Sequence, residues 1–505
     1  MVLEEFNQRF IIYVNLYCIV FLVIIKITMK PENSTPKIDY DVAIVGAGPV
    51  GLATALGLRQ RGIKNIIVLD QTRAFRQVGQ TIGLLPNGMK ALRYIHTQAH
   101  KNLTEEFKKS KNPLKEDPSK QKWTMRNVNG EKIPSPSKGL GEIFGKYGEH
   151  LGLIPWYELQ TQLRRLLPEN LVKPNHRFIS VVAEPEFQCV RADFVSNLGA
   201  KPNPYSYWED QQKKARTNTE SSSQFPESEI TSIRAKLLIG ADGINSTVRQ
   251  SIYKDTPYSA YSKPKYSGFS GVQTEGIYQV PEALSQQIKE QFFDDAKTAA
   301  IYNYPTSETS TINQEPTMKM LIWSYEPGEF EYLIDAIMPF ESLAGKVGKD
   351  LIDSLVLELK KANFPEIIQR LVALSPPENL ANRPFYIHPV NIPAPDRAKW
   401  SIGRVVLVGD AAHGMPPVAG QGANQGMEDA AAIATLVAKI NQQNQWDDTA
   451  GIETAFDKYE SLRRPIVEIA QEGSMRIRSF YSEWHEQFAE EIYGRNIAEI
   501  MQTLL

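Results

Sequence analysis

The sequence predicts an α/β fold that opens with a strand, a helix and a second strand. Residues 42–45 (VAIV) form a continuous apolar run, which is typical of a strand buried on both faces. A glycine-rich turn follows, then a helix over residues 49–61 and a second apolar strand over residues 66–69. Further apolar runs at residues 237–240 and 404–408 predict more strands of the same buried type.

Composition describes a chain of several domains with large apolar cores. The chain has 505 residues, and its 42% hydrophobic and 23% charged residues exclude wholesale disorder. Because 56 Lys and Arg nearly balance 58 Asp and Glu, we expect no nucleic-acid partner. Two cysteines and seven scattered histidines offer neither a disulfide framework nor a metal site, so we expect a cytoplasmic enzyme without a metal.

An apolar stretch at residues 10–25 is of borderline length for a membrane-spanning helix. Such a helix needs about 17 to 25 apolar residues, and the stretch reaches that range only when residues 26–28 are included. One interpretation is membrane association through residues 10–28, with the main body in the cytoplasm. The other is a start at Met29, because the sequence after it leads directly into the first strand. No small-residue cleavage site follows, so a cleaved signal peptide is not predicted.

Hydrophilic stretches divide the rest of the chain. We expect them to be surface insertions or long loops, since they lack apolar periodicity. Between them, residues 320–325 predict a strand and residues 426–440 a helix, and the chain is expected to be helical from Ile452 onward. The hydrophilic stretches are residues 101–122, 201–229 and 306–317.

The first motif is GAGPVG at residues 46–51, between the first strand and its helix. In a GxGxxG turn, Gly46 permits the tight turn, Gly48 lets a pyrophosphate approach the backbone, and Gly51 lets the helix pack on the strand. Asp70 ends the second strand, where an acid would bind an adenosine ribose. The motif therefore predicts an ADP-bearing cofactor, and it leaves FAD and NAD open.

Two more motifs follow buried strands. The run LLIGADG ends in Asp242 and Gly243, and the run VVLVGDAAH carries Gly409 and Asp410 before the loop PPVAGQGANQG at residues 416–426. Taken singly, an Asp-Gly pair also makes ordinary turns, and an aspartate after a strand also begins helices.

In this order, the three motifs resemble the fingerprints of single-component FAD-dependent aromatic-ring hydroxylases, the group A flavoprotein monooxygenases. The resemblance covers residues 39–474 and includes residues 76–87, Tyr459 and residues 463–465 (RRP). It implies an α/β architecture in which a Rossmann-like FAD-binding domain is interleaved with a β-sheet substrate domain, followed by C-terminal helices.

On this resemblance the two domains alternate along the chain. The N-terminal hydrophobic segment and linker are expected at residues 1–38, and a C-terminal helical region at residues 446–505. The FAD-binding domain is expected at residues 39–120, 151–180, 235–258 and 385–445, and the substrate domain at residues 121–150, 181–234 and 259–384.

The resemblance also implies cofactor contacts. Asp410 would hold hydroxyls of the ribityl chain, and backbone N–H groups of residues 416–424 would face N1 and C2=O of the isoalloxazine ring, where reduced flavin carries negative charge. His413 is expected to be structural, and Ser246 and Arg249 to support packing and the phosphate side. The cofactor-binding residues predicted are Gly46, Gly48, Gly51, Asp70, Asp242, Gly243, Gly409, Asp410, Pro417, Gly420, Gly422, Ala423 and Asn424.

The sequence departs from the family pattern at three positions. Asp70 stands where glutamate is more usual and is chemically equivalent. Trp156 stands where many relatives place an arginine that contacts the cofactor, and Arg164 and Arg165 cannot be assumed to replace it. Thr81 stands where relatives often have glycine, which leaves open how closely the backbone approaches the flavin.

The family activity would be monooxygenation. NADH or NADPH reduces FAD, O2 then forms a C4a-hydroperoxide, and one oxygen atom hydroxylates or epoxidises a small organic substrate, aromatic or lipophilic. No second GxGxxG follows a strand, which fits relatives without a separate nicotinamide-binding domain. No catalytic acid or base can be named. The pocket candidates are Tyr266, Phe269, Trp323 and Tyr325.

Two alternatives share the same motifs. A FAD-dependent reductase of the geranylgeranyl-reductase type would saturate a double bond instead of transferring oxygen. A non-catalytic, membrane-associated protein would bind FAD that NAD(P)H never reduces. A flavin halogenase is disfavoured, because the sequence has no WxWxIP segment.

Overall fold

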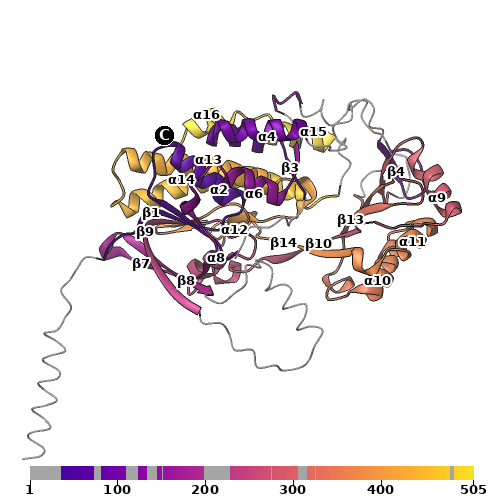
Figure 1. Ribbon diagram of the computed structural model, residues 1–505, viewed down its shortest axis with the longest axis horizontal. Helices are drawn as coiled ribbons and strands as arrows, with labels where there is room; N and C mark the ends of the chain where they lie inside the picture. The colour runs from indigo at the N-terminus through magenta and orange to yellow at the C-terminus, as the bar shows by residue number, and fades with distance from the viewer. Residues whose placement is uncertain are drawn as a thin grey trace, which may run out of the picture. The chain divides into compact units, whose positions relative to one another are not determined.

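The computed structural model describes residues 36–72, 81–109, 123–133, 145–149, 152–197, 228–274, 276–304, 315–324, 326–477 and 483–505. Residues 40–505 form one unit that contains two large sheets (Figure 1). The apolar segment at residues 10–28, residues 76–79, Tyr325 and most of the three hydrophilic stretches lie outside the described residues. Among the helices that the structure describes, none is long and apolar enough to span a membrane.

The first sheet is the parallel one expected from the apolar runs. Its strand β1 lies between β2 and β9, and both pairings are parallel, as is that of β9 with β16. Strands far apart in the chain are therefore neighbours, and their carboxyl ends meet at one edge of the sheet. The path runs β15 (Ser401–Ile402), β16 (Val405–Leu407), β9 (Ser228–Gly240), β1 (Tyr40–Val45), β2 (Ile66–Leu69) and β6 (Val172–Lys173).

A β-hairpin extends this sheet. Strands β7 (Arg177–Glu184) and β8 (Cys189–Asn197) pair with each other, and β8 also pairs with the first half of the long strand β9. The second half of β9 pairs with β1. Residues expected in the second part of the substrate domain are thus joined by hydrogen bonds to the first sheet, and the division of the chain into domains stays a prediction.

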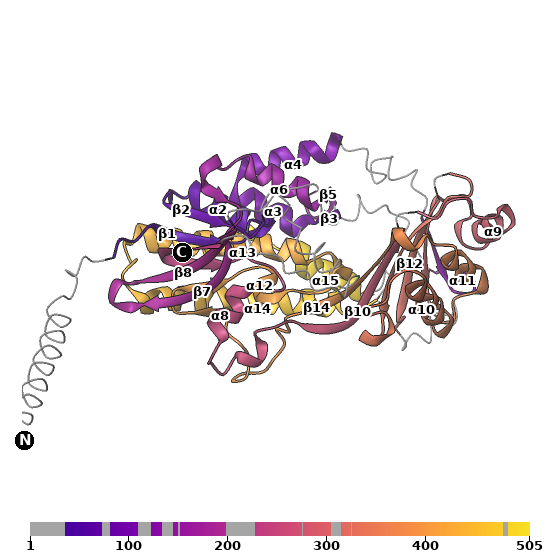
Figure 2. The ribbon, with the colours of Figure 1, turned by 60° about the horizontal axis from the view of Figure 1, so that its bottom comes forward.

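Helices rich in small residues cover the first sheet. Helix α13 (Gly422–Gln442) packs against α2 (Pro49–Gln60), α3 (Pro86–Ile95) and α14 (Thr449–Ser474) (Figure 2). Helices α13 and α2 approach closely because a glycine of α2 faces an alanine of α13. A Cβ at Gly57 would lie only 2.8 Å from the Cβ of Ala434.

The second sheet is mainly antiparallel. One face packs on helices α9 (Glu282–Ile288), α10 (Gly348–Lys361) and α11 (Glu366–Ala373), which Figure 2 shows beside it. The other face carries a smaller cluster, which includes Val418 of the loop at residues 416–424. The strand order is β14 (Leu380–Ile387), β10 (Lys265–Thr274), β13 (Glu331–Ile337), β12 (Met318–Trp323), β11 (Thr298–Tyr302) and β4 (Trp123–Asn127).

One expected loop is partly helical. The stretch at residues 101–122 was expected to be a surface insertion, but residues 101–109 belong to helix α4 (Thr97–Lys109). Ala99 and Leu103, four residues apart, are buried on one side of this helix, so a hydrophilic composition hid an amphipathic pattern. The remaining elements are β3 (Thr81–Leu84), β5 (Gly152–Pro155), α6 (Trp156–Arg164), α8 (Thr247–Tyr253), α12 (Asp410–His413), α15 (Glu483–Tyr493) and α16 (Ile497–Gln502).

Candidate active site

The first and second motifs meet where β1 and β9 end side by side. Gly46 has φ +107°, a region that favours glycine, and a Cβ there would lie 2.3 Å from the carbonyl oxygen of Ala241. A Cβ at Gly51 would lie 2.1 Å from the carbonyl oxygen of Gly46. Glycine is therefore required at both positions, and the DG turn is held against the glycine loop.

Val50 joins the first motif to the third. A Cβ at Gly409 would lie 3.2 Å from Cγ2 of Val50, and one at Gly426 would lie 2.3 Å from the same atom. The GD turn and helix α13 thus close on the N-terminal turn of α2. All three motifs converge at the carboxyl ends of the parallel strands, the usual ligand position in such sheets.

Asp70 shapes the glycine loop directly. Its carboxylate accepts hydrogen bonds from the backbone N–H of Ala47 at 2.6 Å and of Thr72 at 2.7 Å. Gln160 of α6 donates to the carbonyl oxygen of Ala47 at 2.6 Å, which fixes the loop from the other side. A carboxylate has about four acceptor positions, so Asp70 retains capacity for ribose hydroxyls.

Asp410 is the carboxylate whose chemistry best fits a flavin ribityl chain. Its side chain is exposed, and among the residues that the structure describes no donor contacts its carboxylate. The protein atoms packed around its carboxyl group raise its pKa, although the residue itself is more exposed than its neighbours Gly409 and Ala411. A Cβ at Gly422 would lie 3.5 Å from Oδ1 of Asp410, so the GD turn and the start of α13 line the same space. An acceptor without donors suits hydroxyl groups of a ligand.

Asp242, by contrast, already has protein partners. It accepts hydrogen bonds from the hydroxyl of Ser246 at 2.5 Å and from the backbone N–H groups of Thr247 and Val248 at 2.7 and 3.1 Å. Its carboxylate thus caps helix α8. Burial nevertheless raises its pKa. The DG turn itself bends at Gly243, which has φ +79°.

The side chains of Arg249 and Asn424 also form hydrogen bonds within the protein. The Arg249 guanidinium donates to the carbonyl oxygens of Ala411 and Ala412 at 3.0 and 2.8 Å, which ties α8 to α12. The Asn424 amide donates to the carbonyl oxygens of Gly83 and Gly420 at 2.9 and 2.7 Å and accepts from the N–H of Leu85 at 2.9 Å. Only the backbone of Asn424 is left for a cofactor.

A buried charge network lies beneath this loop. Arg463 contacts Glu428 at 2.5 Å and Asp429 at 2.9 Å, and Asp429 lies 2.5 Å from Nε2 of His413. Burial opposes ionisation of Asp429, but the charges of His413 and Arg463 outweigh it, so its pKa lies below its usual range. Arg495 supplies a second cation to Glu428. His413 is completely buried and paired with Asp429, which favours the structural role predicted for it.

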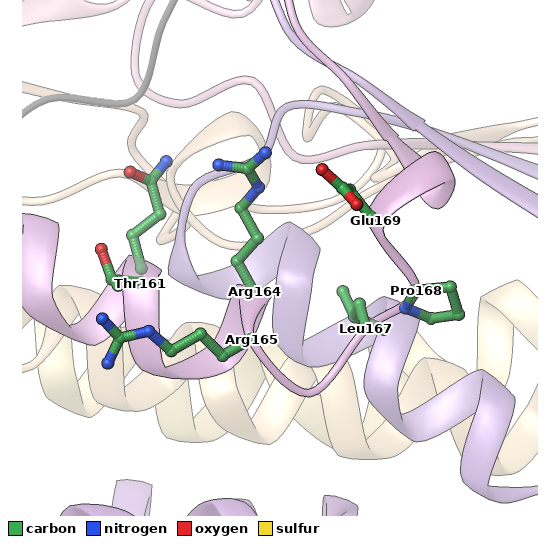
Figure 3. A pocket seen from close by; sticks show the side chains of 7 residues that line it. Thr161, Arg164, Arg165, Leu167, Pro168 and Glu169 are labelled. Atoms are coloured by element: carbon green, nitrogen blue, oxygen red, sulfur yellow. The ribbon is translucent and has the colours of Figure 1, made fainter.

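Trp156 lies at the glycine loop. Its Cζ2 is 3.8 Å from the position of a Cβ on Gly48, so an indole stands at the loop where the resemblance predicts an arginine. Arg164 ends α6 about two turns after Trp156, Arg165 follows it, and the two side chains point in different directions (Figure 3). They line a cavity of about 330 Å³ together with Gln160, Thr161, Leu167, Pro168 and Glu169.

The described residues that were predicted to line the pocket have different surroundings in the structure. Phe269 belongs to the apolar cluster on the sheet face that includes Val418. Tyr266 instead donates to the carbonyl oxygen of Met338 at 2.9 Å and packs on Phe340. Trp323, the last residue of β12, donates a hydrogen bond from its indole N–H to Glu331 at 2.6 Å. The sequence argument missed other members of the Phe269 cluster, among them Met125, Tyr302, Leu321 and Phe385.

Comparison with known proteins agrees with this geometry. The chain matches the FAD binding domain family over residues 39–117 and 302–474. It is 26% identical over 467 residues to the FAD-dependent monooxygenase orf3 of Aspergillus niger, with 89% of each chain covered. It is 24% identical over 448 residues to the 3-amino-4-hydroxybenzoate 2-monooxygenase of Streptomyces cremeus, with 88% of each covered.

Solved structures show the same fold. A salicylate hydroxylase substrate complex aligns with a TM-score of 0.57 at 17% identity, covering 92% of this chain and 97% of that one. HpxO of Klebsiella pneumoniae, complexed with FAD and uric acid, aligns with a TM-score of 0.53 at 19% identity, covering 93% and 98%. The reductase alternative is not favoured by these relatives. The chain belongs to the FAD-dependent monooxygenases that resemble aromatic-ring hydroxylases, and it is an oxidoreductase that uses FAD, NADH or NADPH, and O2.

Proposed function

We propose that FAD binds where the three motifs converge and that the enzyme oxygenates a small organic ring compound there. The observation that carries the proposal is Asp410, an exposed carboxylate beside Gly422 that no donor contacts within the described part of the chain. Hydroxyls of a ribityl chain would supply the missing donors. Gly46, Gly48, Gly51 and Asp70 would hold the ADP half.

The remaining predicted residues would hold the flavin half. Gly243 and Asp242 would place the turn after β9 against the cofactor, and Gly409 would give the bend that presents Asp410. The 3-10 turn Pro417–Ala419 and the αL residue Gly420, with φ +62°, would aim backbone N–H groups at the ring. Ala423 and Asn424 would contribute backbone from the first turn of α13.

The protein's part in the chemistry is orientation, electrostatics and exclusion of water. Bound FAD would supply hydride acceptance from NADH or NADPH and delivery of one oxygen atom to the substrate. The N-terminal end of α13 would stabilise negative charge on the ring, because its first N–H groups are free of intrahelical partners. Pro416 and Pro417 carry no N–H and would border the ring without attracting water.

The substrate would lie against the cluster on the second sheet. Phe269, Tyr302 and Phe385 bring aromatic surface to the same cluster as Val418 of the loop. Aromatic surfaces of this kind suit planar organic molecules. The similar proteins carry the names of ring substrates, among them aminohydroxybenzoate and phenazine dicarboxylic acid, which supports a ring compound as substrate.

The N-terminal segment gives two testable alternatives. If residues 10–28 associate with a membrane, the full chain should sediment with membranes and a variant starting at Met29 should not. If they do not, both should behave alike. Either way, the shortened variant should bind FAD normally, because the first strand begins only at Tyr40. Loss of FAD on shortening would show that the upstream residues support the fold.

The test of the function starts with the purified protein. We expect one non-covalent FAD per chain, reduced anaerobically by NADH or NADPH and reoxidised by O2. Supplied with phenolic and polyene compounds under 18O2, the enzyme should place one labelled oxygen atom in a product. A saturated alkene product without label would instead show a reductase, and flavin that neither nucleotide reduces would show a binding protein.

A further inference from the structure

A buried ion pair lies in the middle of the second sheet. Lys319 of β12 and Asp335 of β13 are directly opposite each other, with Nζ 3.0 Å from Oδ2. Their side chains are 9% and 8% exposed. Both strands are internal to the sheet, so the small exposed area opens onto one face of it and not onto an edge.

Strand alternation tells which face that is. Met318 and Met320, the neighbours of Lys319, pack in the core formed with α9, α10 and α11. Ile334 and Ala336, the neighbours of Asp335, pack in the same core. Successive side chains of a strand point to opposite faces. Lys319 and Asp335 therefore lie on the other face, which carries the cluster containing Val418 of the proposed flavin loop.

Aromatic side chains surround the pair on that face. Tyr302 of β11 is directly opposite Lys319, and directly opposite residues have Cβ atoms about 4.5–5.5 Å apart. On the other side, Gly271 of β10 is opposite Asp335. A Cβ at Gly271 would lie 2.5 Å from the ring of Phe385, so this ring covers the glycine next to the carboxylate.

The ammonium of Lys319 and the carboxylate of Asp335 can each form further hydrogen bonds. Among the residues that the structure describes, the side chains of Lys319 and Asp335 have no hydrogen-bond partner besides each other. An ammonium has three donors and a carboxylate about four acceptor positions. Groups buried to this degree normally satisfy most of that capacity. A pair placed among aromatic rings with free donors and acceptors has the composition of a ligand site.

We propose that Lys319 and Asp335 form the polar anchor of the substrate site and bind a hydroxyl group on the substrate ring. The hydroxyl accepts a hydrogen bond from the Lys319 ammonium and donates one to the Asp335 carboxylate. The inference rests on the proposed function, because it names two residues of the same site that would select a substrate by its ring hydroxyl.

A hydroxyl fits the pair better than an acid group does. A substrate carboxylate has no donor for Asp335 and would place a second negative charge close to it in a poorly solvated pocket. An ether has an acceptor for Lys319 and likewise no donor. The anchor therefore discriminates between phenol, benzoate and anisole, three probes with the same ring.

The experiment measures binding of these three probes to the FAD-loaded enzyme by calorimetry and by the change in flavin absorbance. We expect phenol to bind at least tenfold more tightly than anisole or benzoate. In K319M/D335L, which removes both charges at similar volume, phenol and anisole should bind equally. K236M is the matched control, because Lys236 pairs with Asp41 at 2.8 Å in the first sheet, and it should keep the preference.

The isosteric variant D335N covers the case in which the double variant fails to fold, and it should lose most of the phenol preference. The inference is overturned if wild type binds none of the probes, binds phenol no better than anisole or benzoate, or if phenol preference survives both substitutions. FAD content and anaerobic reduction by NAD(P)H are measured on the same samples. Failure there counts against the proposed function, whereas normal reduction with no phenol preference counts against this inference alone.

Discussion

Nε of Arg463 lies 2.9 Å from Oδ1 of Asp429, and both side chains are almost completely buried. This ion pair joins α14 to α13 just after the loop that would hold the flavin ring. Arg463 also donates to the carbonyl oxygen of Gln425 at 3.1 Å, within the first turns of α13. The position of the loop thus depends on a buried network in which the charges of Arg463, Glu428 and Asp429 are paired.

Replacing Arg463 by glutamine should strongly destabilise the protein. The change leaves Glu428 and Asp429 buried without their shared cation, and breaking such a pair costs about 3–5 kcal/mol. Urea unfolding of the FAD-loaded enzyme measures the loss. R476Q is the control, because Arg476 pairs with Glu472 near the surface and should lose less than about 1 kcal/mol. Equal effects of the two substitutions would contradict a special role for the network.

Asp410 is expected to retain the flavin without supporting the fold. Its carboxylate contacts no described donor, so D410A should keep the melting temperature of the apoprotein within a few degrees. FAD should bind at least tenfold more weakly, as when a charged hydrogen-bond partner of a ligand is lost. Fluorescence titration of apoprotein with FAD measures this. D457A, at the exposed pair with Lys399, is the control, and full FAD occupancy in D410A would remove Asp410 from the site.

Gly422 offers a graded test of how closely the cofactor approaches. Among the described residues, a Cβ there meets Oδ1 of Asp410 alone, at 3.5 Å, which is an ordinary contact, so G422A should fold and bind FAD nearly as wild type does. The two γ-carbons of valine would extend further into the cleft. G422V should therefore fold but bind FAD at least tenfold more weakly and release more hydrogen peroxide per NAD(P)H oxidised. Equal FAD affinity in the two variants would place the ring away from Gly422.

Local patterns predicted the cofactor half of the fold well. The strand at residues 66–69 has the predicted bounds, and the helix expected at residues 49–61 ends one residue earlier. These elements follow from short-range apolar runs and glycines. Helix α13 begins at Gly422, four residues before the expected start, because its first turn is glycine-rich and was interpreted as loop.

The hydrogen bonds and ion pairs of individual side chains could not be predicted, because they depend on contacts between distant segments. The sequence gives Asp242 and Asp410 equivalent motif positions, yet only Asp242 caps a helix. Lys319 and Asp335 form a pair through the register of β12 and β13, which no local pattern specifies. A lysine between two methionines and an aspartate within YLIDAI were the only signals.

The neutral state of His388 should make the protein sensitive to acid. His388 bridges the DG and GD segments. Its ring Nε2 lies 2.8 Å from the carbonyl oxygen of Ile244, and its backbone N–H donates to the carbonyl oxygen of Gly414. Burial, with the charge of Arg249 adding to it, lowers its pKa to about 3. In the unfolded chain a histidine has a pKa of about 6.5. The unfolded state therefore binds one more proton between these values.

Stability should consequently fall as pH drops below about 6.5, by about 1.4 kcal/mol per pH unit from this residue, until about pH 3. His388→Gln can keep a donor for Ile244 but cannot bind the proton. Between pH 7 and pH 5 it should lose about 2 kcal/mol less stability than wild type does, as measured by urea unfolding at each pH. His176→Gln, at a histidine that is only half-buried, is the control. If the pH dependence of H388Q matches that of wild type, the histidine is already protonated in the folded enzyme or exchanges its proton without unfolding.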